Sequence, residues 1–214
     1  MEPTHVPLAA NSIKILVWDV PVRVFHWLMV LCFAGAYLTS ESESLKTVHT
    51  TLGYTMAGLI VFRLVWGFIG SRHARFSDFV RGPAAVASYL RSLLQGKPQH
   101  FLGHNPAGAL AIVALLVLGA LTTASGWFAL QETSGEQWEE IHETIANLML
   151  AVVLLHVAGV IVSSRLHHEN LVASMFSGKK AGDAGQGLRR GWHSIGWLLL
   201  LGVAAFWWLQ WKIS

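Results

Sequence analysis

The stretch HETIANLMLAVVLLH, residues 142–156, decides how this chain folds. It begins and ends with a histidine, and Glu143 is its only charged residue. A segment this apolar is typical of a helix surrounded by lipid. In a helix, fourteen residues rise about 21 Å and make nearly four complete turns, so His142 and His156 share one face at two depths. We therefore expect a membrane helix with two histidines directed to the same side.

The rest of the chain has the same character, because hydrophobic residues make up 53% of its 214 residues and charged residues only 13%. Five apolar stretches approach the roughly 20 residues that a helix needs to cross a bilayer. We predict an all-α membrane protein, in which a four-helix transmembrane bundle is followed by a fifth, C-terminal transmembrane helix. The stretches cover residues 22–38, 48–69, 106–130, 145–162 and 195–209.

The basic residues are sorted by loop, and this sorting predicts the orientation. Most lie before the first helix, between the second and third, or between the fourth and fifth, which places those segments in the cytoplasm. The chain would then cross the membrane several times, with a cytoplasmic N-terminus and a periplasmic C-terminus. Its pI near 9.2 reflects this topology and not a nucleic-acid partner. The opposite loops collect Glu41, Glu43, Glu132, Glu136, Glu139, Glu140 and Glu143.

The segments between the membrane helices also carry information. Residues 83–94 place apolar side chains on one face with Arg91 beside them, which predicts an amphipathic helix on the membrane surface. A segment rich in glycine and lysine separates the first four helices from the fifth. We divide the chain into a four-helix membrane domain (1–178), a cytoplasmic linker (179–192) and an additional transmembrane helix (193–214).

Four of the eleven histidines fall within the predicted membrane helices: His26, His49, His142 and His156. A polar ring in hydrocarbon is costly unless it has a partner, so four such rings in one bundle indicate a functional site. Depth alone pairs them. His26, near the inner end of the first helix, matches His156. His49, near the outer end of the second helix, matches His142.

Two facing imidazoles at one depth can take both axial positions of a haem iron. The chain has a single cysteine, Cys32, and no CxxCH motif, which excludes covalent haem attachment. We therefore predict two haems b, with the four histidines as axial ligands of the iron and with no catalytic side chain. Two such layers would form an electron path across most of the bilayer.

Two arginines are candidates for binding the anionic haem propionates. Arg63 lies fourteen residues after His49, so it occupies nearly the same face at the depth of the inner layer. An equally weighted alternative is a snorkelling side chain, since about two helical turns separate Arg63 from the inner boundary. Arg23, one turn before His26, is a weaker candidate that can also serve as an orientation signal.

These segments together resemble the bacterial di-haem cytochrome b family, which includes bacterial cytochrome b561 proteins and the b-type subunit of membrane-bound nickel-iron hydrogenases. The resemblance covers about residues 14–178, and the fifth helix departs from the family's four-helix pattern. It implies a four-helix core in the bacterial inner membrane, two bis-histidine haems, and electron exchange between the quinone pool and a periplasmic redox partner. The matching segments are WDVPVRVFHW (18–27), His49 with Gly53, RLVWG (63–67), SRHARF (71–76), LGHNP (102–106) and the histidine pair at 142 and 156.

The first functional hypothesis is respiratory electron transfer, with quinone or quinol as substrate and a periplasmic c-type cytochrome as partner. The acidic outer loops suit a basic protein of that kind. Candidates for an inner quinone site are His104, Asn105, Arg75 and the cluster at 167–169, and an outer site is equally allowed. The sequence leaves open whether the chain has quinol oxidoreductase activity of its own and whether it forms homo- or hetero-oligomers.

Three alternatives remain. The chain could be the membrane subunit of a hydrogenase-like complex, an oxidoreductase of superoxide or another small molecule, or a metal transporter. A transporter that uses histidines as a relay would carry acidic residues along the same path. The interiors of the predicted helices contain no Asp or Glu, which disfavours this last function.

Overall fold

Five helices of the described chain are long and apolar enough to cross a membrane, which confirms the prediction of an all-α membrane protein. The computed structural model describes residues 13–97, 99–131 and 136–213, so Glu132, counted above among the outer acids, lies outside it. The five helices are α1 (Val20–Thr39), α2 (Lys46–Ile69), α5 (Pro106–Ala129), α6 (Gln137–Leu166) and α8 (His193–Ile213).

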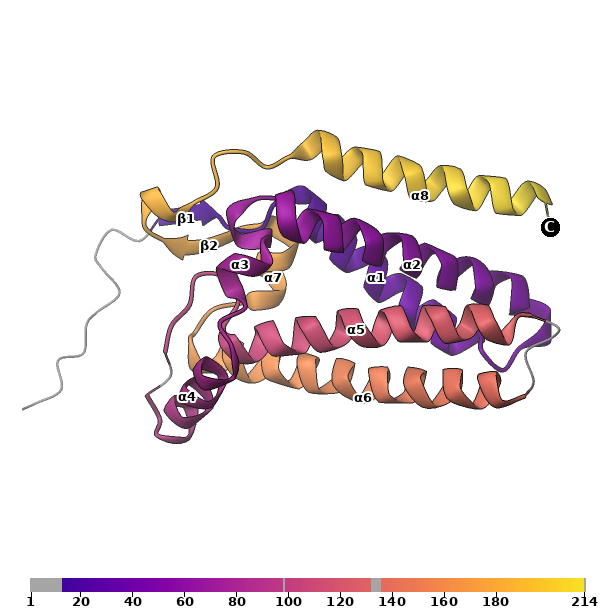
Figure 1. Cartoon of the computed structure of the whole chain (residues 1–214). Coiled ribbons are helices and arrows are strands. Elements are labelled where there is room, and N and C mark those ends of the chain that lie inside the picture. Colours follow the sequence, from indigo (N-terminus) through magenta and orange to yellow (C-terminus); the bar gives the residue numbers. More distant parts are fainter. Residues whose placement is uncertain (1–12, 98, 132–135, 214) are drawn as a thin grey trace, which may run out of the picture.

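The shorter elements gather at one end of the bundle, which we call the sheet end (Figure 1). The last residues of α1 and α5 and the first residues of α2 and α6 lie at the opposite end, which we call the hairpin end. Helix α4 has the bounds of the predicted amphipathic helix. The elements at the sheet end are β1 (Ile13–Leu16), α3 (Phe76–Phe79), α4 (Pro83–Leu94), α7 (Leu171–Ser177) and β2 (Lys179–Gly182).

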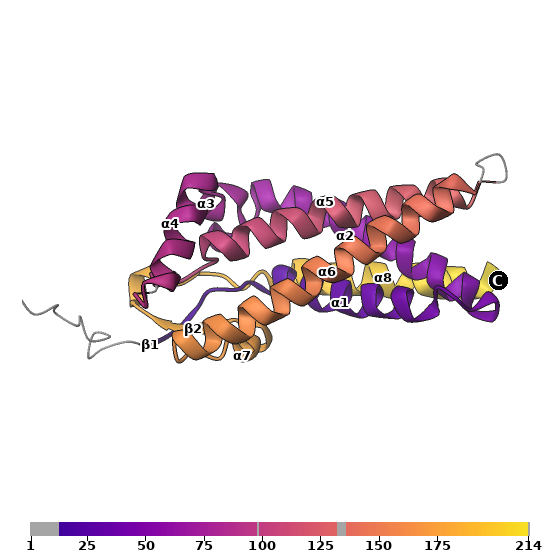
Figure 2. The same ribbon diagram turned by 90° about the horizontal axis from the view of Figure 1, so that it is seen from below.

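Two antiparallel hairpins form the bundle, α1 with α2 and α5 with α6 (Figure 2). Helix α2 also packs on α5, which joins the hairpins. Between them lies a buried cluster of Cys32, Phe33, Met56, Leu59 and Met149. Met149 is seven residues from each histidine of α6, so this apolar cluster fills the level between the two predicted layers.

Asp19 caps the N-terminus of helix α1, where the first backbone N–H groups have no partner within the helix. Its carboxylate accepts a hydrogen bond from the Val22 backbone N–H at 2.8 Å, and Pro21 occupies a first-turn position where no N–H is needed. The other carboxylate oxygen accepts from the Trp66 indole N–H at 3.0 Å. Asp19 is therefore both a helix cap and a buried link between α1 and α2.

The segment before α1 is paired with the segment after α7. Strands β1 and β2 form an antiparallel ladder in which Ile13 faces Gly182 and Leu16 faces Lys179. Helix α7 ends at Gly178, whose positive φ of 78° suits glycine and whose carbonyl accepts from the backbone N–H groups of Val17 and Trp18. Part of the region that the sequence predicts as a linker thus forms ordered backbone contacts.

Helix α8 packs along α1 and contacts α2. Leu199 and Val203 contact the central cluster, and the Trp207 indole N–H donates to the Thr55 hydroxyl at 2.8 Å. Gly196 lies against Val20 so closely that an added Cβ would come within 2.5 Å of its side chain. These contacts dock the fifth helix on the first hairpin.

We expect Asp19→Ala to destabilise the protein by roughly 2 kcal/mol, because it removes a helix cap and leaves the buried Trp66 N–H without an acceptor. The loss is measured as a shift in the unfolding transition of the purified protein in detergent. Asp183→Ala is the matched control, since Asp183 is exposed and its side chain makes no capping bond. Equal stability of the two variants would contradict the role given to Asp19.

Candidate functional site

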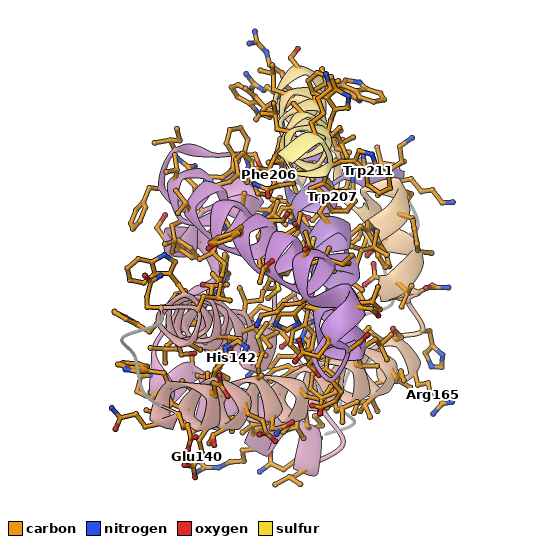
Figure 3. The ribbon with its side chains drawn as sticks, turned by 90° about the vertical axis from the view of Figure 1, so that its right-hand side faces the viewer. Glu140, His142, Arg165, Phe206, Trp207 and Trp211 are labelled. Atoms are coloured by element: carbon orange, nitrogen blue, oxygen red, sulfur yellow. The ribbon has the colours of Figure 1, made fainter. Side chains whose placement is uncertain are left out.

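The four membrane histidines lie on three helices at two levels. His26 is near the start of α1 and His49 near the start of α2, so they lie toward opposite ends of the bundle. His142 and His156 are both on α6, with His142 toward the hairpin end. His142 points into the bundle, whereas Glu140 points away from it (Figure 3). All four rings are half-buried.

The pair at the hairpin end is brought together directly. The ring centres of His49 and His142 are 6.1 Å apart, and the ring planes are nearly perpendicular at 83°. The Nδ1–H of His49 donates to the Ala36 carbonyl at 2.9 Å, and that of His142 donates to the Thr122 carbonyl at 2.9 Å. Because a carbonyl only accepts, both rings carry their proton on Nδ1, which leaves the Nε2 lone pairs free.

This geometry fits the axial ligation of a haem iron. Two metal–imidazole bonds of about 2 Å, together with the distance from each ring nitrogen to its ring centre, separate two ring centres by about 6 Å. A second-sphere hydrogen bond from Nδ1–H to a carbonyl is the usual way in which proteins orient a histidine ligand. The residues present therefore fit haem b at this level.

Gly126 makes the His142 position possible. A Cβ at Gly126 would lie 2.9 Å from Cε1 of His142 and 3.1 Å from its Nδ1, which is too close for an ordinary contact. The missing side chain exposes the Thr122 carbonyl one turn earlier on α5. In the sequence Gly126 is only one small residue among several, and its contact with His142 could not be read from spacing.

The pair at the sheet end is less completely partnered. His26 and His156 lie within electrostatic range of each other, and the His26 ring contacts the edge of Trp27 at 5.0 Å between centres. The Nδ1 of His26 is buried without a hydrogen-bond partner among the described residues. The structure thus places these two rings at the same end, as the depth argument predicts.

Arg63 is buried, with 3% of its surface exposed, so its guanidinium does not reach solvent. Its guanidinium carbon lies 4.9 Å from the centre of the Phe76 ring, within the range of a cation–π contact. Asp19 lies within electrostatic range. Arg23 donates through one terminal nitrogen to the Phe176 carbonyl. Both arginines have one buried donor without a partner among the described residues, Nε of Arg23 and Nη1 of Arg63.

Buried polar atoms without a hydrogen-bond partner among the described residues concentrate at the sheet end. Buried polar atoms without partners are rare in folded proteins, and a group of them indicates a missing polar ligand. The carboxylates of a haem held by His26 and His156 would supply acceptors for the arginine and indole N–H groups among them. The atoms concerned are Arg23 Nε, His26 Nδ1, Trp27 Nε1, Arg63 Nη1 and His104 Nδ1.

His104 lies in a loop, but its Nδ1 is buried and its ring contacts two aromatic side chains. Its ring lies 4.5 Å from Trp18 and 4.8 Å from Phe79, measured between ring centres. Burial lowers the pKa of His104 to about 3, and the positive charges of Arg63 and Lys180 add to this effect. The ring is therefore neutral at pH 7. Nothing in its spacing along the sequence indicates this aromatic enclosure.

A bundle of membrane-length helices with two opposed histidine pairs defines the class of membrane b-type cytochromes. The family model described as prokaryotic cytochrome b561 matches residues 17–178, so the chain belongs to that family. It is accordingly a multi-pass membrane cytochrome that transfers electrons by means of haem b.

The chain is also similar to curated proteins that are named probable Ni/Fe-hydrogenase B-type cytochrome subunits. The protein from Rhizobium leguminosarum bv. viciae is 23% identical over 82% of this chain and 92% of its own. That from Azotobacter vinelandii is 29% identical over 54% of this chain and 59% of its own. A third, named as the subunit of hydrogenase 1 of Escherichia coli K12, is 24% identical over 58% and 63%. No solved structure matches the chain.

We expect Gly126→Ala to push the His142 ring away from the Thr122 carbonyl. Forcing a methyl group into such a contact costs roughly 1–3 kcal/mol, and the displaced ring should hold haem less well. Haem-to-protein ratio and unfolding temperature measure the two effects. Gly202→Ala is the control, because nothing lies within 4 Å of an added Cβ at that position. Normal haem content in Gly126→Ala would contradict this account of the contact.

Proposed function

We propose that this cytochrome carries electrons across the membrane through two bis-histidine haems b, between the quinone pool and a redox protein at the hairpin end. The observation that carries the proposal is the geometry of His49 and His142, whose ring centres lie 6.1 Å apart and whose Nδ1 hydrogen bonds leave both Nε2 lone pairs free to bind a metal. Bound haem b supplies a one-electron ferric/ferrous couple. The protein's part is to orient the imidazoles and to exclude water.

The second haem is assigned to His26 and His156. The fourteen-residue interval on α6 sets the two levels about 21 Å apart along the helix. Apolar side chains of the central cluster occupy the level between them. Two observations support a haem at the sheet end. His26 lies within electrostatic range of His156, and several buried polar atoms at this end have no partner among the described residues.

We assign Arg63 and Arg23 to the propionates of the sheet-end haem. Arg63 is favoured over Arg23 because its charge is buried and because Asp19, the carboxylate within electrostatic range, already accepts two hydrogen bonds. The sorting of basic residues supports a cytoplasmic sheet end in the bacterial inner membrane. We keep the division into a 1–178 membrane domain, a 179–192 linker and a 193–214 additional helix as part of this proposal.

Quinone is assigned to the sheet end, and the redox partner to the hairpin end. The exposed glutamates there, including Glu139, Glu140 and Glu143, would attract a basic protein such as a c-type cytochrome. The names of the relatives favour a second candidate, a hydrogenase-like enzyme that would form a stable complex with the chain. The two candidates differ in how firmly the partner is held.

The pairing predicts which substitutions are equivalent. His26→Leu and His156→Leu should each remove the same haem, and His49→Leu and His142→Leu the other, which lowers the content from two haems per chain to one. Haem-to-protein ratio and redox titration distinguish the two groups. His193→Leu, at an exposed position, should leave both haems in place. A protein that binds no b-type haem at all, although correctly folded, would refute the proposal.

A basic c-type partner would be steered by charge. We therefore expect electron transfer to a commercial basic cytochrome c to slow as ionic strength rises, and Glu139→Gln combined with Glu140→Gln to slow it further at low salt. Lys97→Gln, exposed at the opposite end, is the control. A rate that does not depend on salt, together with stable co-purification of a hydrogenase-like enzyme, would favour the second candidate.

A further inference from the structure

At the hairpin end, the carbonyl that holds His142 accepts a second side-chain hydrogen bond. The Thr122 carbonyl accepts the Nδ1–H of His142 at 2.9 Å and the hydroxyl of Ser125 at 3.1 Å. The Ser125 oxygen itself lies 3.3 Å from the same Nδ1, and only 3% of the surface of this serine is exposed. The imidazole nitrogen, the hydroxyl and the backbone oxygen therefore form a compact triangle of polar atoms.

The carbonyl that holds His49 has the same arrangement in the other hairpin. The Ala36 carbonyl accepts the Nδ1–H of His49 at 2.9 Å and the Thr39 hydroxyl at 3.2 Å. As in the first case, the hydroxyl belongs to the residue three positions after the carbonyl on the same helix. Thr39 also donates to the Gly35 carbonyl at the shorter distance of 2.8 Å. Because the Thr39 proton is divided between two acceptors, its bond to the shared carbonyl is the weaker of the two hydroxyl bonds.

Hydroxyl bonds of this kind are ordinary in helices, where serine and threonine often donate to the carbonyl three or four residues earlier. Thr55 and Thr123 do so in this bundle. The carbonyls that hold His49 and His142 differ from these, because each accepts a ring proton as well. At the sheet end, the Nδ1 of His26 has no hydrogen-bond partner among the described residues. The shared acceptor is therefore a feature of the hairpin-end pair.

A hydroxyl that shares the acceptor weakens the hydrogen bond of the histidine. A carbonyl oxygen has only two lone pairs, and each further donor leaves it a poorer acceptor for the imidazole proton. The strength of this bond matters, because a strong bond from the Nδ1–H makes the imidazole a more basic metal ligand. A more basic axial ligand stabilises ferric over ferrous iron, so hydrogen bonds around the ligand set part of the reduction potential of a haem.

We propose that the Ser125 hydroxyl, and to a smaller extent that of Thr39, raises the reduction potential of the haem at the hairpin end. This inference rests on the proposed function. Both are positioning residues, since they act on the histidine ligands through the two carbonyls and not on the iron itself. The hydroxyls thereby favour the reduced state at the end of the bundle that we assign to the redox protein. The haem at the sheet end should be independent of both residues.

Ser125→Ala in the full-length cytochrome tests this, because alanine removes the hydroxyl and adds no atoms to a buried site. Anaerobic redox titration of the b-type absorption band gives the midpoint potentials of both haems. The component that is absent from His142→Leu identifies the hairpin-end haem. We expect Ser125→Ala to lower the potential of this component by about 30–60 mV, a roughly threefold to tenfold change in the ferric-to-ferrous ratio. Thr39→Val should lower it by less, and the other component should not move.

Thr123→Ala is the matched control for loss of a hydroxyl from α5. The Thr123 hydroxyl donates to the Gly119 and Ala120 carbonyls, and neither of them accepts from a histidine of the described chain. Its removal should leave both potentials unchanged. Thr39→Ser keeps a hydroxyl at the end of α1 and should retain the potential that Thr39→Val loses.

An unchanged or higher potential of the hairpin-end haem in Ser125→Ala would overturn the proposal. So would an equal shift of both haems, or a shift of the same size in Thr123→Ala, because a general loosening of the bundle would produce either. If Ser125→Ala does not retain haem, Thr39→Val is judged by the same criteria, since valine keeps the shape of threonine. An unmodified protein that binds fewer than two b-type haems would instead reject the proposed function.

Discussion

The hydrogen bond from an imidazole to a backbone carbonyl is the interaction on which the rest of this structure depends. In hydrocarbon a histidine ring needs an acceptor for its N–H, and the described helices provide one for His49 and one for His142. Ala36 offers its carbonyl from the last turn of α1, where carbonyls lack helical partners. Thr122 offers its carbonyl from within α5, where Gly126 leaves it uncovered. These two bonds fix the rings and their tautomers, and each ties a ring to the other helix of its own hairpin, His49 to α1 and His142 to α5.

The two histidine levels differ in how the protein satisfies their polar groups. At the hairpin end the backbone satisfies the ring nitrogens, so the site is largely complete in the polypeptide alone. At the sheet end several buried donors have no partner in the described chain, and charged groups such as Arg63 stand among aromatic rings. A small polar cavity lined by His100, His167 and Glu169 also lies at this end. The asymmetry agrees with a function in which the two ends serve different redox partners, a protein at one and quinone at the other.

Much of the fold could be predicted, because lipid imposes a length and a composition on each spanning helix that can be read directly. The histidine pairing followed from depth, which depends only on helical rise and topology. The contact of Gly126 with His142, the bond from Trp207 to Thr55 and the enclosure of His104 could not be predicted. Each depends on how two helices are rotated about their axes, and hydropathy is nearly uniform around helices that face lipid.

The pairing of β1 with β2 has a consequence for how the molecule is made. The segment ahead of α1 emerges first from the ribosome, yet its partner strand, Lys179–Gly182, is synthesised only after α6 and α7. The ladder therefore cannot close until four spanning helices have left the ribosome. Until then the first helix lacks its final anchor, which leaves an interval in biosynthesis when the bundle is still open for a bulky prosthetic group to enter. The small sheet therefore forms after the four helices that carry the histidines, and α8 docks after it.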